Sequence, residues 1–112
     1  MGDTTLLWNK EGALKRMMGK QALLDKIIDL FLAQFPQVWT SAKSAVANSN
    51  WKEVASQAHT LKGSAAELGL ERLADALRVL EHAARTEDET SAIKAQVEVD
   101  AVVEKTLPLL TR

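Results

Sequence analysis

The chain has 112 residues, 46% hydrophobic and 26% charged, with 14 basic and 15 acidic side chains and no cysteine. This length can enclose one hydrophobic core, so we expect a single domain over residues 1–112. A net charge of -1 argues against nucleic-acid binding, and the lack of cysteine excludes disulfides and thiolate-ligated metals. No apolar run reaches the ~20 residues of a membrane helix. The first ten residues show neither the basic region nor the long apolar stretch of a signal peptide, so we expect a cytoplasmic protein.

Few residues interrupt helices, because the chain has only two prolines and five glycines. A short helix is expected at about 10–18, before Gly19, and an apolar helix with helical periodicity begins near residue 21. Pro36 should break or kink this second helix, because proline lacks an amide donor and clashes with the preceding turn. A separate piece, from about 36 to 47, would then start at the proline.

The next helix is marked at both ends. It follows a polar loop at residues 48–50, in which Asn50 is a good N-cap. Glu53, three residues later, completes a capping-box-like pair with it. The helix should run from about 51 to 68, where Gly69 can adopt the left-handed conformation that ends helices.

Two further helices complete the pattern. The segment from about 70 to 85 carries apolar residues at helical spacing, namely Leu73, Leu77, Leu80 and Ala84. A charged turn at residues 86–90 precedes the last helix, at about 91–107, whose expected core residues are Ile93, Val97, Val102 or Val103, and Leu107. No segment alternates apolar and polar residues as a strand would. Long helices with short loops predict an all-α, antiparallel up-and-down four-helix bundle with a short additional N-terminal helix.

The helix at about 51–68 has an apolar stripe and an unusual opposite face. At ~100° per residue, the stripe stays within roughly 40° of one line; it consists of Val54, Ala58, Leu61, Ala65 and Leu68. His59 lies about 140° from Val54, and Gly63 lies about 180° from it. Ala66, at about 120°, shares this face, and Lys62 flanks it at roughly 80°. His59 therefore points away from the core, one turn from Gly63.

This outward face breaks a local rule, since a glycine inside a helix costs ~1 kcal/mol relative to alanine. Such breaks tend to mark function, and without a Cβ at Gly63 another surface could approach His59 closely. An imidazole is a competent nucleophile near pH 7, and the ammonium of Lys62 suits the oxygens of an anionic group. Together these residues suggest phosphoryl transfer. Two plainer interpretations stay open at this point: a surface histidine without a role, and a glycine that serves helix packing.

Residues 58–69, AHTLKGSAAELG, closely resemble the signature of histidine-containing phosphotransfer (HPt) domains. In that family, H-x-L-K-G-S/A and a small residue precede a leucine–glycine helix end. The similarity continues upstream and into the next helix, at Leu30, Phe31, Phe35, Leu70, Leu73, Ala76, Leu80 and Glu81. The resemblance implies an intermediate in a multistep His–Asp phosphorelay, of the kind found in hybrid sensor histidine kinases. It leaves open whether the chain is a free-standing carrier or the cytoplasmic C-terminal piece of a membrane-bound kinase.

The resemblance also implies roles for individual residues. His59 would accept a phosphoryl group on Nε2 from the aspartate of one receiver domain and pass it to the aspartate of another response regulator. Lys62 would stabilise the charge of the phosphate. Glu81, on the following helix, would hydrogen-bond Nδ1 of His59, although a glutamate at that position can equally be a solvated helix residue.

A docking surface for receiver domains is implied as well. We assign to it the small residues around His59, which are Gly63, Ala66 and position 55 (Ala55, beside Ser56). Either Leu23 or Leu24 would extend this surface. Response-regulator receiver domains are thus the expected partners, with no nucleic-acid or membrane contact, and we expect a monomer.

No cofactor is expected in this chain, and Mg²⁺ would be held by the partner receiver domain. The sequence contains no G-x-x-x-x-G-K-[ST] loop, so we expect a phosphoryl carrier rather than an enzyme that uses ATP. Two alternatives come from other classes. One is a catalytically inactive helical adaptor that docks a receiver domain. The other is a cofactor- or metal-binding bundle, which would need two inward-facing ligands, whereas His59 faces outward. His82 could pair with His59 as a metal ligand, but it is expected to face solvent.

Overall fold

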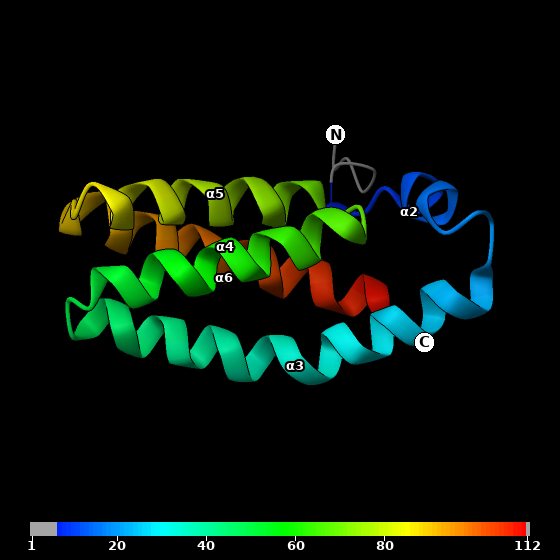
Figure 1. Cartoon of the computed structure of the whole chain (residues 1–112), viewed down its shortest axis with the longest axis horizontal. Helices are drawn as coiled ribbons and strands as arrows, with labels where there is room; N and C mark the ends of the chain where they lie inside the picture. Colours follow the sequence, from blue (N-terminus) through cyan, green and yellow to red (C-terminus); the bar gives the residue numbers. More distant parts are fainter. Residues whose placement is uncertain (1–6, 112) are drawn as a thin grey trace.

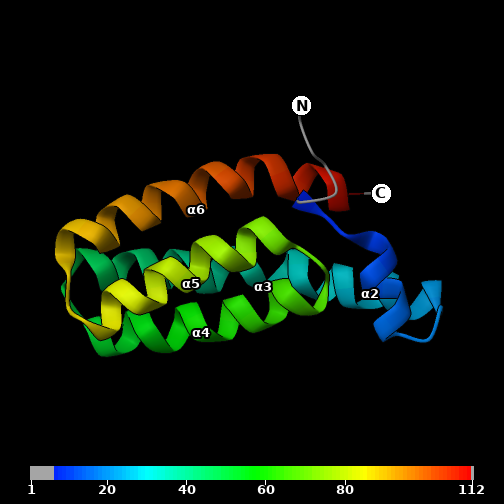
Figure 2. The same ribbon diagram turned by 90° about the horizontal axis from the view of Figure 1, so that it is seen from above.

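The computed structural model describes residues 7–111 and shows helices but no strand in that range. The described helices are α2 (Lys10–Arg16), α3 (Gln21–Ala47), α4 (Trp51–Glu67), α5 (Glu71–Arg85) and α6 (Glu89–Leu110). The four long helices lie side by side and alternate in direction, while α2 lies at one end of them (Figures 1 and 2). α3 and α5 each pack against both α4 and α6. The predicted all-α four-helix bundle with a short extra N-terminal helix is confirmed.

The core lies between the four long helices and determines how α4 is rotated about its axis. The predicted stripe of α4 is buried along its whole length, and so are the four apolar residues predicted for α5. Phe35, Leu24 and Ile28 of α3 are among the largest side chains that are fully buried. Because this apolar stripe is buried against the other helices, the opposite face of α4 must point away from the bundle.

The ends of α4 are close to the prediction. The side chain of Asn50 accepts a hydrogen bond from the amide of Glu53 at 3.4 Å, as an N-cap should. The amide of Asn50 donates instead to the carbonyl of Ala45 at 2.9 Å, so it is satisfied by the preceding helix and not by Glu53. At the other end Gly69 has a φ of +78°, the left-handed conformation expected there.

Pro36 does not divide α3, so the predicted separate piece from about 36 to 47 is wrong. The helix continues through the proline and curves gently along its length (Figure 1). Phe31, Phe35 and Trp39 are buried across this region, with successive ring centroids 5.1 and 6.4 Å apart. A proline inside a helix costs about 3 kcal/mol, whereas burying one such aromatic side chain contributes roughly 1.5–3 kcal/mol. Three aromatic residues on the buried side therefore outweigh the local cost of Pro36.

The last helix starts earlier than predicted and buries a different face. Asp88 is its N-cap, since its carboxylate accepts from the amide of Ser91 at 3.1 Å and from the Ser91 hydroxyl at 2.7 Å. Ile93 and Val97 were expected in the core but are 48% and 63% exposed, so that part of the prediction is wrong. The buried residues are Ala92, Ala95, Val99, Val102, Thr106 and Leu110. Apolar residues of α6 lie on more than one of its faces. The face that carries Ala92 and Ala95 is the buried one, because these small side chains let the helix approach its neighbours closely.

The segment before α3 completes the C-terminal end of α4. The indole of Trp8 donates to the carbonyl of Leu68 at 3.1 Å, and the amide of Asn9 donates to the carbonyl of Gly69 at 2.7 Å. The guanidinium of Arg16 donates to the carbonyls of Ala66 and Glu67, at 2.8 and 3.2 Å. A helix end leaves carbonyls without an intrahelical partner, and three of these four are of that kind, while the carbonyl of Ala66 also accepts from the amide of Gly69 at 3.0 Å. Residues 8–16 therefore anchor the end of α4.

None of the helices within residues 7–111 is long and apolar enough to cross a membrane.

The contact between Gly69 and Asn9 leads to a stability prediction. A Cβ at residue 69 would clash with the backbone carbonyl oxygen of Asn9, and the residue also needs a left-handed φ. Gly19 has a similar φ of +75° but open space around it. Gly19→Ala should therefore lower the free energy of unfolding by about 1–2 kcal/mol, from backbone strain alone. Gly69→Ala should lower the free energy of unfolding by clearly more than Gly19→Ala, and chemical denaturation measures both losses. Equal losses would show that the Asn9 contact gives way without cost.

Candidate functional site

His59 lies on the outward face of α4, as the helical wheel predicts. Its side chain is 63% exposed, while its neighbours Ala58 and Leu61 are buried in the core. Gly63 and Ala66 follow on the same side of the helix and are also exposed. The burial of the α4 stripe thus presents the imidazole to an approaching molecule.

Gly63 leaves open space beside this histidine. A Cβ built at this position would meet no atom of a neighbouring element within 4 Å, in the part of the chain that the structure describes. Close packing of another helix therefore does not explain the glycine. The missing side chain leaves a shallow depression in the surface one helical turn from His59. A glycine inside a helix lowers stability by ~1 kcal/mol relative to alanine.

Glu81 of α5 is the buried partner of the imidazole. Its side chain is only 8% exposed, and its Oε2 atom lies 3.0 Å from Nδ1 of His59. The same oxygen accepts from two nitrogens of Arg85, at 2.6 and 3.1 Å. Nζ of Lys62 lies 2.8 Å from the other oxygen, Oε1. Glu81 is thus a buried carboxylate among three cationic or donor groups, and not a solvated helix residue.

These contacts hold the pKa of the Glu81 carboxyl down. Burial has the largest individual effect and raises the pKa, because it removes the charged form from water. The contacts from Lys62, Arg85 and His59 together outweigh burial and lower the pKa from 4.5 to about 2. Glu81 is consequently ionised near neutral pH.

The charge of Glu81 determines the tautomer that we assign to His59. An ionised carboxylate can only accept hydrogen bonds, so Nδ1 of His59 must carry the proton in the 3.0 Å contact with Glu81. In the neutral ring the lone pair is then on Nε2. In its neutral form the exposed imidazole therefore has its lone pair on Nε2, on the side away from Glu81.

The other candidate positions lie around this centre. Ala55 is half-buried and, with Ser56, lines a shallow pocket between α4 and α5 to which Arg85 also contributes. Ala66 lines a second shallow pocket next to Gly63. His82 is exposed. Within residues 7–111 no group of three or more His, Asp or Glu side chains is arranged to hold a metal ion.

Leu23 and Leu24 separate clearly in the structure. Leu24 is fully buried in the core, whereas Leu23 is exposed on the same helix. Only Leu23 is therefore available to a partner.

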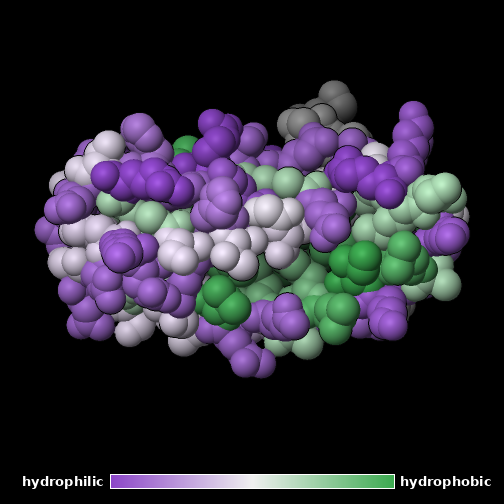
Figure 3. All heavy atoms as spheres, viewed as in Figure 1, coloured by the Kyte–Doolittle hydropathy of each residue, from purple (hydrophilic) through white to green (hydrophobic). Residues whose placement is uncertain are grey.

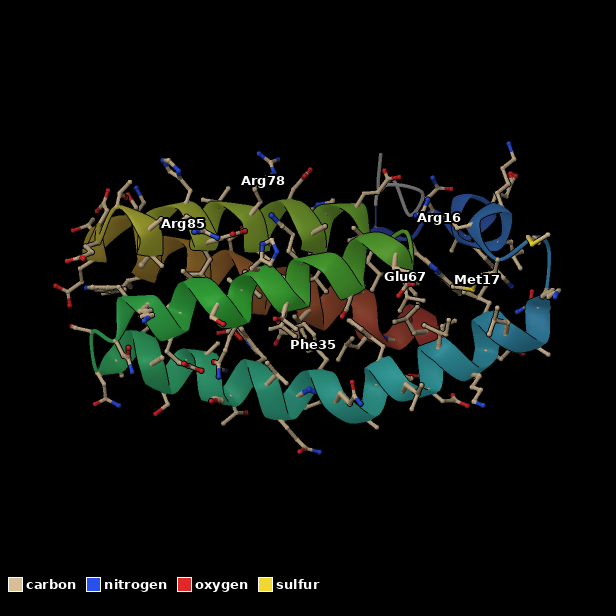
Figure 4. All side chains as sticks on the ribbon, in the orientation of Figure 1. Arg16, Met17, Phe35, Glu67, Arg78 and Arg85 are labelled. Carbon is tan, nitrogen blue, oxygen red and sulfur yellow. The ribbon has the colours of Figure 1, made fainter. Side chains whose placement is uncertain are left out.

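Sequence reasoning missed Arg85 as a member of this cluster. It is exposed at the end of α5, and Figure 4 labels it on the side of α5 that is seen next to α4. Its spacing of four residues from Glu81 is a signal that could have indicated this contact, because side chains four residues apart on a helix are neighbours. The spacing alone could not indicate that the carboxylate between them is buried.

The fold and this cluster together define a helical-bundle domain that presents one histidine, held by a buried carboxylate, on an accessible surface. Residues 26–107 match the family model of the Hpt domain. The match spans most of the chain, and the chain therefore belongs to the Hpt domain family. Membership implies phosphotransfer in a two-component phosphorelay, and Hpt domains are phosphocarriers rather than kinases. No curated protein and no solved structure shows a significant match to this chain.

The low pKa of Glu81 predicts an acid-dependent loss of stability. A carboxyl group whose pKa is lower in the folded than in the unfolded state stabilises the fold at pH values above its unfolded-state pKa. This stabilisation is lost as the pH falls through the folded-state pKa. The shift from 4.5 to about 2, after allowance for screening at the exposed Arg85, corresponds to about 1–2 kcal/mol lost over that pH range.

Denaturant titrations at a series of pH values measure this loss. The slope between pH 4.5 and 2 should be smaller in Glu81→Gln than in the natural sequence. Glu104→Gln, at an exposed carboxyl of α6, is the control and should keep the natural slope. If both variants follow the natural pH dependence, Glu81 does not carry the low pKa.

Proposed function

We propose that this chain is a phosphorelay carrier in which His59 receives a phosphoryl group from the aspartyl phosphate of one receiver domain and passes it to the aspartate of another. The observation that carries the proposal is the exposed imidazole, whose Nδ1 contacts the buried, ionised Glu81 at 3.0 Å. Lys62 and the open space at Gly63 flank this imidazole. The arrangement combines a nucleophile, a cation and room for the partner.

The first transfer proceeds without any proton leaving the chain. The lone pair of His59 Nε2 forms the N–P bond while the bond from phosphorus to the donor aspartate oxygen breaks, and the electrons of that bond remain on the aspartate. The imidazole becomes cationic and keeps its proton on Nδ1, where the carboxylate of Glu81 stabilises the new charge. The ground-state hydrogen bond thus becomes a charge-assisted one.

The second transfer reverses these changes. An oxygen of the accepting aspartate forms a bond to phosphorus, and the electrons of the N–P bond return to Nε2. The neutral imidazole is regenerated with its proton still on Nδ1. Catalysis then consists mostly of positioning and charge neutralisation, which is what phosphoryl transfer requires.

Lys62 is the residue that would face the transferred phosphoryl group. It lies three residues after His59 on α4, and its side chain is 29% exposed. Its ammonium needs only to turn from Oε1 of Glu81 toward the phosphoryl oxygens. We propose that Mg²⁺ is held by the receiver domain, so that this chain contributes one cation and the partner contributes the metal.

An apolar groove beside the histidine face suits the docking of a receiver. It lies between α3 and α4, where Thr60 and Ser64 form one edge. The opposite side includes Ile27, Leu30 and Phe31 of α3. Figure 3 shows apolar surface gathered at the lower right, where Figure 1 places the N-terminal half of α3 next to α4. We propose that the receiver covers this groove together with Gly63 and Ala66.

The first functional test is substitution of the histidine. A receiver domain carrying a radiolabelled aspartyl phosphate should transfer acid-labile, alkali-stable label to the natural chain and none to His59→Gln. His82→Gln is the matched control, because it removes the other, exposed histidine, and it should accept label at the natural rate. Label that persists in His59→Gln would place the phosphoryl group elsewhere. A chain that binds the receiver but takes no label would be the inactive adaptor.

The second test concerns the open space at Gly63. Gly63→Gln should raise the free energy of unfolding by about 0.5–1 kcal/mol, because glutamine is the better helix former. The same change should slow transfer and weaken receiver binding, since the longer side chain fills the approach to His59. Stopped-flow transfer and titration calorimetry measure the two effects. Natural kinetics in a stabilised variant would remove the role of Gly63 in partner approach.

A further inference from the structure

Arg85 donates two hydrogen bonds to the carboxylate that faces His59. Its Nε and Nη2 atoms both donate to Oε2 of Glu81, at 3.1 and 2.6 Å. This is the oxygen that lies 3.0 Å from Nδ1 of His59. An exposed pair at this spacing on a helix contributes only about 0.3–0.5 kcal/mol to stability. Here, however, the acceptor is buried and is itself a hydrogen-bond partner of the functional histidine.

Lys62 contacts Glu81 in a different way. Its Nζ lies 2.8 Å from Oε1, but this oxygen accepts no aligned hydrogen bond from the described residues. The lysine thus contacts Glu81 through a single ammonium at the end of a flexible side chain. Arg85 instead fixes Oε2 through two directed bonds from a planar group. The two cations thus contact different oxygens of Glu81, and Arg85 restrains its oxygen more firmly than Lys62 does.

We propose that Arg85 is a positioning residue of the phosphotransfer site, which keeps Oε2 of Glu81 aimed at Nδ1 of His59 while Lys62 moves between Glu81 and the phosphoryl group. This inference rests on the proposed function of His59. When a phosphoryl group is on Nε2, its negative oxygens attract Lys62, and Glu81 loses one of its two cationic neighbours. Arg85, on α5, remains and offsets the repulsion between the carboxylate and the phosphoryl group.

Arg85 therefore acts through Glu81 and need not touch the phosphoryl group. Without it, the buried carboxylate would keep only Lys62 and the Nδ1–H of His59 as partners among the described residues, and moving Lys62 away would cost more in desolvated charge. The carboxylate would also be free to turn, which would weaken its selection of the Nδ1–H tautomer. Both effects reduce the fraction of His59 with its lone pair on Nε2.

The test compares Arg85→Gln with Arg78→Gln. Both variants remove one exposed positive charge from α5. Arg78, however, donates to Asp75 at 2.9 Å, and Figure 4 labels it closer to the middle of α5 than Arg85. The imidazole nitrogen shifts of His59, measured by NMR on the unphosphorylated chain, report the ratio of the two tautomers. Transfer from a radiolabelled receiver reports the rate, and circular dichroism checks the fold.

Arg85→Gln should lower the ratio of Nδ1–H to Nε2–H tautomer and slow transfer by about tenfold, the change expected when one charge-assisted hydrogen bond is lost. Arg78→Gln should change neither quantity. Arg85→Lys, which keeps the charge but loses the planar pair of donors, should restore the rate only in part.

The inference is overturned if Arg85→Gln and Arg78→Gln show the same tautomer ratio, or if the ratio changes while the transfer rate stays natural. Failure of the proposed function has a different signature. In that case the natural chain takes no label on His59, while the tautomer ratio still distinguishes the two arginine variants.

Discussion

The buried negative charge of Glu81 is the constraint on which the rest of the site depends. An ionised carboxylate removed from water is costly unless charges and donors surround it, and here they come from two helices. His59 and Lys62 approach from α4, and Arg85 approaches from α5 itself. The site therefore forms only when the two helices have the correct rotation and register. In return, the carboxylate gives an otherwise solvent-exposed imidazole one preferred orientation and one preferred tautomer.

The packing of the bundle supplies that rotation and register. Leu77, Leu80 and Ala84 of α5 are buried beside Glu81, so the carboxylate lies at the edge of the apolar stripe and close to α4. On α4, burial of Ala58 and Leu61 turns His59 outward and leaves Lys62 at the boundary. The cluster around His59 is thus positioned by core side chains that are not part of it. Rigid helices, and not loops, hold every residue of the cluster.

Much of this arrangement follows from local patterns. The stripe of α4 could be predicted because its apolar residues allow only one face to be buried, and the outward position of His59 follows from it. The rotation of α6 could not be predicted, since Ile93 and Val97 form an alternative apolar face and only the neighbouring helices decide between the two. The continuity of α3 depends on aromatic residues that meet the core on both sides of Pro36. The burial of Glu81 likewise depends on how α4 packs against α5, so the sequence of either helix alone could not indicate it.

The bonds from residues 8–16 to the end of α4 have a consequence for where this domain begins. The family match starts at residue 26, after α2 and within α3. Trp8, Asn9 and Arg16 nevertheless satisfy four carbonyls at the end of the helix that carries His59. The region matched by the family model therefore leaves out residues that hydrogen-bond to the end of α4. A chain trimmed to the matched region would keep His59, Lys62, Glu81 and Arg85 and yet expose the end of α4 to fraying.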